Sequence, residues 1–509
     1  MKLRIGSAIA VLAACAANLV AQAPSTGNTA QAQQVQLSGR NPAAGSVTAT
    51  QSAIPGTTTS VNTINPGLSV SGPFSGSVSG AGKPFSGKLS LKDAIDRGLE
   101  FNLGSKNLSI TLQQSRGQSI VTRSALLPNL NGSLTEVVQQ TDLAAAGFRI
   151  HIPIPGITIP SIVGPFNYFD LRARLSQTVA DFAALNNYRS SVEAIHANEF
   201  LAQDAKDLVV LAVGGAYLQV EAAQARIDAE RAQLQTARDL YDQTAQQRAV
   251  GLLAQVDVNR SQVQMLIHQQ RVTSLENDLA KQKINLARMI GLPPNDRFEL
   301  SDQISWADAP ALNEEDAVRI ALSKRPDIKA AEAQVRAAEK AKLAVRGSRM
   351  PSLAVAADYG VIGENPSNSH GTFSFEGSLR FPIWQGGRYE GDLEQANAAI
   401  DQRRAELEDI RSRVESEVRG AYLDLEAASS QVDVARKNLD VARETLALTR
   451  QRLEAGITDF VDVSQAQAAV ASAELDVINS IFAHNLAKLN LARAQGAAGD
   501  SLPQYLKIQ

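Results

Sequence analysis

Residues 216–223 read AYLQVEAA, and residues 421–428 read AYLDLEAA. The same shift of 205 positions continues downstream without a gap and superimposes further identical pairs, Gly251 on Gly456, Asp257 on Asp462 and Arg288 on Arg493. Upstream, a shift of 223 positions matches Asp93 with Asp316, Arg123 with Arg346 and Pro128 with Pro351. A repeat of this length predicts a duplicated unit, in which each half runs helix, proline, variable segment, very long helix, turn and helix.

The long helix of the second half has two apolar edges. One edge alternates spacings of three and four, as in a coiled-coil seam, through Leu425, Ala428, Val432, Ala435, Leu439, Ala442, Leu446, Thr449 and Leu453. The other recurs every seven residues, at Ala427, Val434, Val441, Leu448 and Ala455. A two-stranded coil needs one seam, whereas a helix in the wall of a tube packs against a neighbour on each side. We expect long helices at about 182–249 and 386–455, each on the order of 100 Å long.

The variable segments alternate apolar and polar residues with a period of two, which predicts strands. The expected strands are about 129–141, 166–180, 352–361 and 372–384. The clearest has Phe373, Phe375, Leu379 and Phe381 on one side and Ser374, Glu376 and Arg380 on the other. Each half therefore contributes a hairpin of two strands with one apolar and one polar face, which is typical of strands that face lipid on one side and water on the other.

Four strands do not close a barrel, and an open sheet edge is not tolerated in hydrocarbon. Several chains are therefore expected to share one barrel. About twelve strands enclose an aqueous lumen, and three protomers would supply that number. A periplasmic coiled-coil scaffold is the alternative for the helices alone, but it leaves the two-faced hairpins unexplained.

The N-terminus has the form of a secretory signal over residues 1–23, with Lys2 and Arg4 before an apolar run. Two processing routes stay open. The run ending in Cys15 is similar to a lipoprotein site with Cys15 acylated, and Ala21-Gln22-Ala23 is similar to an ordinary cleavage site. Residues 24–88 are rich in Gly, Ser, Thr, Gln, Ala and Pro and are expected to be extended or disordered. The net charge of -3 gives no indication of a nucleic-acid partner.

Residues 89–496 clearly resemble the TolC family of outer-membrane efflux proteins. The resemblance rests on the duplicated plan, on the run LRFPIWQGGR at 379–388, and on Gly456 to Asp462 followed by a helix. It divides the chain into repeats at 89–291 and 313–496, an equatorial connector at 292–312 and a tail at 497–509. It implies a mainly α homotrimer whose twelve-stranded membrane β-barrel, with four strands per protomer, continues into a periplasmic α-barrel.

The resemblance also implies a function and a gate. The protein would be the outer-membrane exit duct of a tripartite efflux system, working with a periplasmic adaptor and an inner-membrane pump. A type I protein-secretion duct would have the same architecture. In the family, rings of aspartate near the start of the last helix narrow the pore. Asp462 occupies the first ring position and Gln465 the second, Asp459 could compensate, and Asp257 is the possible gate partner. The family's latching tyrosine and arginine correspond to Leu453 and Thr458, so we do not expect the same latch.

Charged residues on the strands are expected to line the lumen, since an Arg facing lipid near the midplane would cost roughly 2 to 4 kcal/mol. They are Arg172, Arg174, Glu376 and Arg380. The five histidines have no ligand spacing, so neither a metal nor a cofactor is expected. No nucleophile is placed beside a base by pattern, and catalysis is not expected.

Overall fold

The computed structural model describes residues 45–54, 63–78, 85, 87–142, 144–145, 160–251, 253–293, 295–302, 306, 313–455, 457–458 and 460–496. The chain divides into two compact units, residues 1–40 and 41–509, and every element below belongs to the second. The predicted signal peptide with Cys15, the residue Asp459 and the tail at 497–509 lie outside the described residues.

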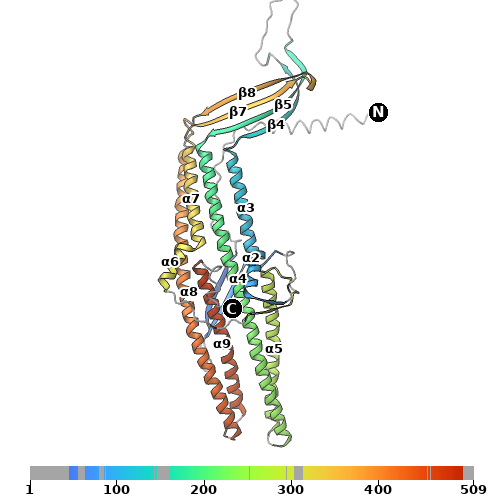
Figure 1. Ribbon diagram of the computed structural model, residues 1–509, viewed down its shortest axis with the longest axis vertical. Helices are drawn as coiled ribbons and strands as arrows, with labels where there is room; N and C mark the ends of the chain where they lie inside the picture. The colour runs from blue at the N-terminus through green and yellow to red at the C-terminus, as the bar shows by residue number, and fades with distance from the viewer. Residues whose placement is uncertain are drawn as a thin grey trace, which may run out of the picture. The chain divides into compact units, whose positions relative to one another are not determined.

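The helices follow the repeat. In the first half, α2 (Leu91–Phe101) and α3 (Leu103–Ser124) precede the strands, and α4 (Phe182–Ala249) and α5 (Gln255–Met289) follow them. In the second half, α6 (Glu314–Lys324) and α7 (Pro326–Gly347) precede the strands, and α8 (Arg388–Glu454) and α9 (Phe460–Ala494) follow them. The long helices α4 and α8 have 68 and 67 residues, within two residues of the predicted limits. Figure 1 shows the strands beyond one end of α3, α4, α7 and α8.

Each upstream helix is interrupted at the same place of the repeat. Asn102 separates α2 from α3, and Arg325, 223 positions later, separates α6 from α7. Both side chains reach the end of the last helix of their own half. Asn102 Nδ2 donates to the Met289 carbonyl at 3.3 Å, and Arg325 Nη1 donates to the Ala494 carbonyl at 3.4 Å. The two halves therefore make an equivalent contact with a neutral amide in one and a cation in the other.

Four strands form one antiparallel sheet in the order β4-β5-β7-β8. They are β4 (Asn129–Asp142), β5 (Ile162–Ala180), β7 (Ser352–Gly363) and β8 (Ser369–Arg380). A short 3₁₀ turn, η3 (Pro366–Asn368), connects β7 to β8. β8 ends at Arg380, four residues before the expected limit, and Pro382 downstream lacks the N–H that a continued ladder needs. The central pair, β5 and β7, joins the hairpin of one half to the hairpin of the other.

The sheet passes into the long helices by two different turns. At the start of α4, the Asp181 carboxylate accepts from the N–H groups of Ala183 at 2.8 Å and Ala184 at 2.9 Å, which caps the helix. At the start of α8, Gly386 and Gly387 have φ of 64° and 82°. Two successive left-handed residues turn the chain sharply, and glycine adopts this conformation without steric cost. This accounts for the glycine pair in the 379–388 run.

Part of the segment 24–88, which was expected to be extended or disordered, forms regular strands. β1 (Val47–Ile54) and β2 (Thr63–Val70) form an antiparallel hairpin, and β3 (Gly87–Leu89) pairs in parallel with β6 (Phe298–Leu300) of the connector. A short 3₁₀ turn, η2 (Gly72–Ser75), follows β2. The hairpin is held because Val47, Ala49, Leu68 and Val70 pack on the core formed by α4, α5 and α9. Scattered single hydrophobic residues are sufficient to form this hairpin because they pack on the surface of the helices.

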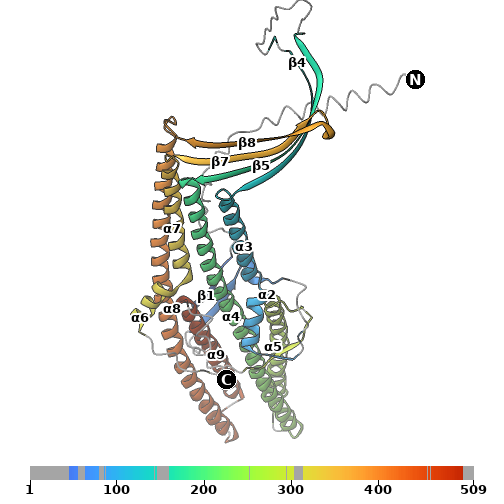
Figure 2. The same cartoon turned by 45° about the horizontal axis from the view of Figure 1, so that its top comes forward.

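One core cluster lies where the repeats meet, around residues 205–222 of α4, and a second joins α6, α7, α8 and α9. By length and composition α4 contains a stretch that could cross a membrane, but 72% of that stretch is buried inside the protein. Burial by α9 and the β1–β2 hairpin accounts for its apolar composition. Figure 2, turned from the first view, again shows α4 among the other helices.

A glycine of α7 sets the distance between the repeats and provides a test. A Cβ at Gly347 would lie 2.7 Å from both the Ala183 nitrogen and the Phe182 carbonyl carbon, which are backbone atoms that cannot turn away. We predict that Gly347→Ala lowers the free energy of unfolding by about 1 to 3 kcal/mol. Gly117→Ala, in α3 with nothing within 4 Å, is the matched control and should not destabilise. Thermal melting followed by circular dichroism checks both, and equal melting temperatures would contradict the packing described.

Candidate functional site

The strand register gathers most charged side chains of the sheet on one face, with Glu136 as an exception on the other. Arg172 pairs with Gly360, and Gly360 pairs with Thr372, so these positions share a face. Counting by twos from them places Asp170, Arg174, Asp358, Ser374, Glu376 and Arg380 on that face as well. We call it the polar face. The four residues predicted to line a lumen, Arg172, Arg174, Glu376 and Arg380, therefore lie together on one side of the sheet.

Arg172 is held by its neighbours rather than free on this face. Its Nε lies 3.3 Å from Asp170 Oδ1, its Nη1 forms an ion pair with Asp358, and Thr372 Oγ1 accepts from Nη2 at 3.0 Å. Ser374 donates to the same Asp358 carboxylate. The guanidinium thus connects β5, β7 and β8. Arg174, Glu376 and Arg380 are exposed and have no such network among the described residues.

The charges of the polar face cancel. Asp170, Asp358 and Glu376 oppose Arg172, Arg174 and Arg380, which are the charged strand residues that the described register places there. A surface with balanced charge attracts neither anions nor cations over distances beyond a Debye length. The sequence had indicated Arg172 and Arg174, but not Asp170 and Asp358 as the partners of Arg172. The strict alternation through Asp170 was the signal that could have found one of them.

The opposite face is apolar and exposed. It presents Leu134 at 68%, Phe375 at 72% and Phe373 at 80% of their full exposure. Leu130, Leu171, Leu175, Tyr359 and Leu379 extend the same exposed face. No helix covers this side in either view of the described sheet (Figures 1 and 2). An apolar patch spanning four strands marks a surface that meets lipid or other protein.

Both outer strands have an unpaired edge. Within the described residues β4 pairs only with β5, and β8 pairs only with β7. β4 has 14 residues and β8 has 12, and the backbone N–H and C=O groups that point outward from alternate residues of each are available for further pairing. An apolar face and two open edges on one sheet are satisfied together only if other strands continue it on both sides.

The two predicted edges of α8 differ in their packing. On the coiled-coil seam, Ala428 and Val432 are fully buried. On the second stripe, Val434, Val441 and Leu448 are 52%, 61% and 53% exposed. One edge of the helix is therefore covered within the chain, by α9, and the other is open. An open heptad stripe is the geometry expected of a helix that packs against a second copy.

The helix turns farthest from the sheet carry the predicted gate residues (Figure 1). Asp462 lies in the first turn of α9, is exposed, and accepts a hydrogen bond from the Thr458 hydroxyl. Gln465 is also exposed, one turn farther along. Thr458, the position expected to correspond to the family's latching arginine, thus contacts the acidic residue from the turn before α9. The sequence suggested only that the latch differs, because the hydroxyl contact spans four positions with no periodic signal.

The repeat-equivalent Asp257 has a different environment. It lies in the first turn of α5, and its ion-pair partner is Arg260 on the same helix, at 3.5 Å. The helix dipole favours an acidic residue at this position whatever its further role. Among the described residues, Asp257 forms no ion pair with a residue of the second half. In the described part of the chain no three His, Cys, Asp or Glu side chains form a group that could hold a metal ion.

Comparisons with known proteins agree with this geometry. The family model described as outer membrane efflux protein matches residues 106–292 and 317–497, one stretch in each half. The outer membrane protein OprJ of Pseudomonas aeruginosa is 25% identical over 438 residues, which covers 82% of this chain and 86% of OprJ. The toluene efflux pump outer membrane protein TtgF of Pseudomonas putida is 24% identical over 425 residues, or 81% of this chain and 84% of TtgF.

A solved structure has the same fold. The Campylobacter jejuni CmeC outer membrane channel superimposes with a TM-score of 0.69 at 16% identity, over 82% of this chain and 88% of CmeC. The resemblance to the TolC family expected from the duplicated plan is confirmed by the family match.

Proposed function

Because the chain belongs to the outer membrane efflux protein family, we propose that three copies of it form a passive exit duct across the outer membrane. Their twelve strands would close a β-barrel, and their helices would continue it as a tube into the periplasm. A barrel of that size leaves a water-filled lumen. The polar face would line the lumen and the apolar face would meet lipid.

The single observation that carries the proposal is the sheet with one exposed apolar face and two open edges. A periplasmic scaffold would have to leave Phe373, Phe375 and their neighbours in water. In a bilayer the same face is favourable, since about 25 cal/mol is gained for each Å² of apolar surface removed from water. The open edges of β4 and β8 would then pair with those of sister subunits.

The helices support the same assembly. The exposed stripe of Val434, Val441 and Leu448 would pack against a neighbouring subunit, as the buried seam does within the chain. Residues between the sheet and the long helix also fit a position at the membrane boundary. Ile383 and Trp384, between β8 and α8, are 95% and 85% exposed, and tryptophan is favoured where headgroups meet water.

The cargo we propose is small molecules, delivered by an inner-membrane pump through a periplasmic adaptor. The names of OprJ and TtgF support the outer-membrane location, and that of TtgF supports efflux of a small molecule. A type I protein-secretion duct is the second candidate with this architecture, but the relatives named above do not favour it. Copurification of the adaptor and pump would distinguish the two.

The constriction we propose lies at the α8–α9 turn, where Asp462, Gln465 and Asp459 from each copy would surround the axis. Asp257 would stand beside it from the α4–α5 turn. In the barrel, Arg174, Glu376 and Arg380 would be solvated by the lumen, while Arg172 would hold three strands in register. Because the polar face is balanced in charge, ion selectivity would be set at the constriction.

Reconstitution tests the proposal directly. The protein purified from outer membranes should run as a heat-modifiable trimer in detergent and should give stepwise conductance in planar lipid bilayers. A mature chain that stays monomeric and soluble without detergent, or that gives no conductance as a purified trimer, would overturn it.

Adjacent residues of β4 test which face meets lipid. Leu134→Arg places a cation on the apolar face and should reduce the amount of assembled trimer, since an Arg near the bilayer midplane costs about 2 to 4 kcal/mol. Thr135→Arg, one residue along on the polar face, should assemble normally. Trimer is measured on unheated gels of outer-membrane fractions. A similar loss of assembled trimer in both variants would contradict the assignment of the apolar face to lipid and of the polar face to the lumen.

Asp462 tests the constriction. Asp462→Lys should reduce block of the channel by multivalent cations added on the periplasmic side, because it reverses the charge of the ring. Asp462→Glu keeps the charge and should keep the block. Single-channel recordings measure the block, and an unchanged blocking concentration for Asp462→Lys would remove this residue from the constriction.

A further inference from the structure

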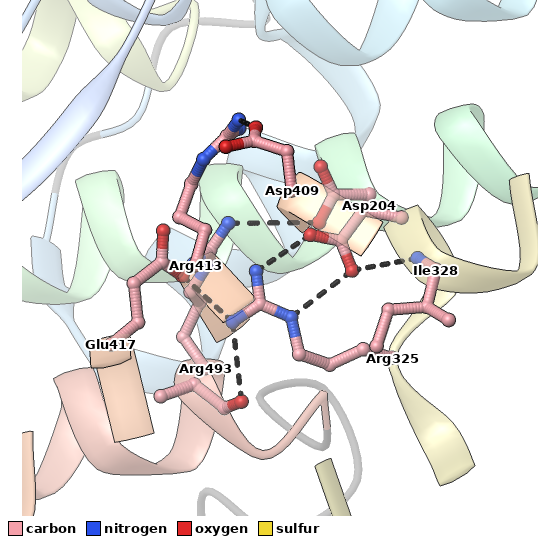
Figure 3. A network of polar contacts seen from close by, with 9 residues as sticks. Asp204, Arg325, Ile328, Asp409, Arg413, Glu417 and Arg493 are labelled. Atoms are coloured by element: carbon pink, nitrogen blue, oxygen red, sulfur yellow. Dashed lines mark hydrogen bonds and ion pairs between the residues drawn. The ribbon is translucent and has the colours of Figure 1, made fainter. Parts of the chain in front are cut away.

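A partly buried ionic network, whose arginines are more buried than its carboxylates, joins the two repeats at the level of the helix break. It consists of Asp204 on α4, Arg325 and Asp327 at the α6–α7 break, Glu417 on α8 and Arg493 on α9. We call these five residues the inter-repeat network. Asp204 is its one member from the first half, and Figure 3 shows it facing the arginines of the second.

Arg325 is at the centre of the network. Its side chain is 3% exposed, and it donates from Nε and Nη2 to the two Asp327 oxygens at 3.0 and 2.7 Å. Its Nη1 lies 2.7 Å from Glu417 Oε2. Two-pronged pairing of this kind is the strong form of an arginine–carboxylate contact. Arg325 is therefore fully matched by Asp327 and Glu417.

Arg493 is shared between the halves. Its Nη1 lies 2.7 Å from the same Glu417 oxygen, and its Nη2 lies 3.7 Å from Asp204 Oδ1. The second distance is too long for a normal hydrogen bond, so Asp204 is the weakly held member of the network. When all five groups are ionised, three carboxylates face two guanidiniums.

The carboxylates differ accordingly. Burial raises the pKa of Asp204, and the attraction of Arg493 only partly offsets it because Asp327 and Glu417 repel its charge. Burial acts in the same direction on Asp327, but its hydrogen bonds with Arg325 bring the net pKa below the ordinary value. The pKa of Glu417 is likewise lowered by Arg493 and Arg325, against the effect of burial. Of the three, Asp204 takes up a proton first as the pH falls.

Other charged groups near Asp204 belong to its own helix and to the helices packed on it. Arg413 on α8 is paired with Asp409 on the same helix, as Figure 3 shows. Lys206 and Asp207 follow on α4, and Asp207 has an interaction of its own. Lys329 lies beyond Asp327 on α7, and Arg116 on α3 is ion-paired with Glu199 of α4 at 3.0 Å. The network itself therefore supplies the charges that Asp204 meets.

The first half keeps Arg288 as the repeat equivalent of Arg493, but among the described residues it forms no ion network at the equivalent break. Asn102 replaces Arg325 there, and its amide donates to the carbonyls of Phe74 and Met289. Position 212, the repeat equivalent of Glu417, is alanine. The amide contact does not titrate. A change of pH therefore acts on the attachment of the second repeat, whose α8–α9 turn carries Asp462, and not on that of the first.

We propose that the inter-repeat network is a proton-sensitive fastening, in which uptake of one proton by Asp204 balances two carboxylates against two guanidiniums and tightens α4 against α6–α9. The sign follows from linkage. A carboxyl that binds protons more readily in the folded than in the unfolded protein destabilises the fold when ionised, and this cost is relieved as the pH falls through its folded pKa toward its unfolded pKa. The stability gained as Asp204 takes up its proton is lost only at lower pH, where Asp327 and Glu417 are protonated.

Thermal stability against pH tests the fastening. In detergent, the melting temperature of the wild-type assembly should rise as the pH is lowered from 8 toward 5. Asp204→Asn should melt at least about 2 °C above the wild type at pH 8 and lose this rise. Asp228→Asn, an exposed carboxyl on the same helix, should keep the wild-type profile. If Asp204→Asn does not fold, Asp204→Ser makes the same comparison.

Two results would overturn the proposal. One is a wild-type pH profile that persists in the neutral variant, and the other is a melting temperature at pH 8 that falls when Asp204 is neutralised. This inference rests on the proposed duct, since it describes how that duct is stabilised. Its test measures melting temperature and not conductance, so the two proposals can fail independently. Even if the protein did not conduct, the dependence of its melting temperature on pH would still support or contradict this inference.

Discussion

The requirement that every strand backbone group find a hydrogen-bond partner away from water governs this structure. The sheet of β4, β5, β7 and β8 satisfies its interior strands within one chain but leaves both outer edges open. Its register gathers the apolar side chains on one face, so the same sheet that is unfavourable in water is favourable in a bilayer. The long helices follow from this constraint, since each hairpin continues directly into α4 or α8. The polar face, with Arg172 between Asp170 and Asp358, keeps three strands in register from the other side.

Duplication explains the framework, and divergence between the copies explains its specialisation. Gly291 and Gly496 occupy equivalent left-handed turns after the last helix of each half. A Cβ on the first would meet Phe101, and on the second Arg325, which are neighbours of equivalent helix breaks. The backbone has therefore been kept while the side chains have changed from a neutral amide at Asn102 to an ion network at Arg325. A similar change separates Asp257, paired on its own helix, from Asp462, which Thr458 contacts.

The fold was largely predictable from the sequence because it is written in periodic patterns. The heptads of α8 and the alternation of β8 are repeated many times, so the helix and strand limits differ from expectation by a few residues. The β1–β2 hairpin was missed because its apolar residues are sparse, and their partner surface on α4 and α9 is formed by residues far away in the chain. The inter-repeat network was missed for the same reason. Asp204, Arg325, Glu417 and Arg493 lie on four separate elements, and no local spacing connects them. The contacts of Arg172 depend on strand register, which alternation alone does not determine.

The open stripe of Val434, Val441 and Leu448 has a consequence for the life of the newly made subunit. A single copy carries this row of hydrophobic side chains, an oily sheet and two unpaired edges from the moment it folds. In the proposed assembly these surfaces would stay exposed until copies associate, so the yield of trimer would depend on the concentration of subunits. The number of the proposed ducts would therefore depend on the supply of subunits as well as on the stability of each one.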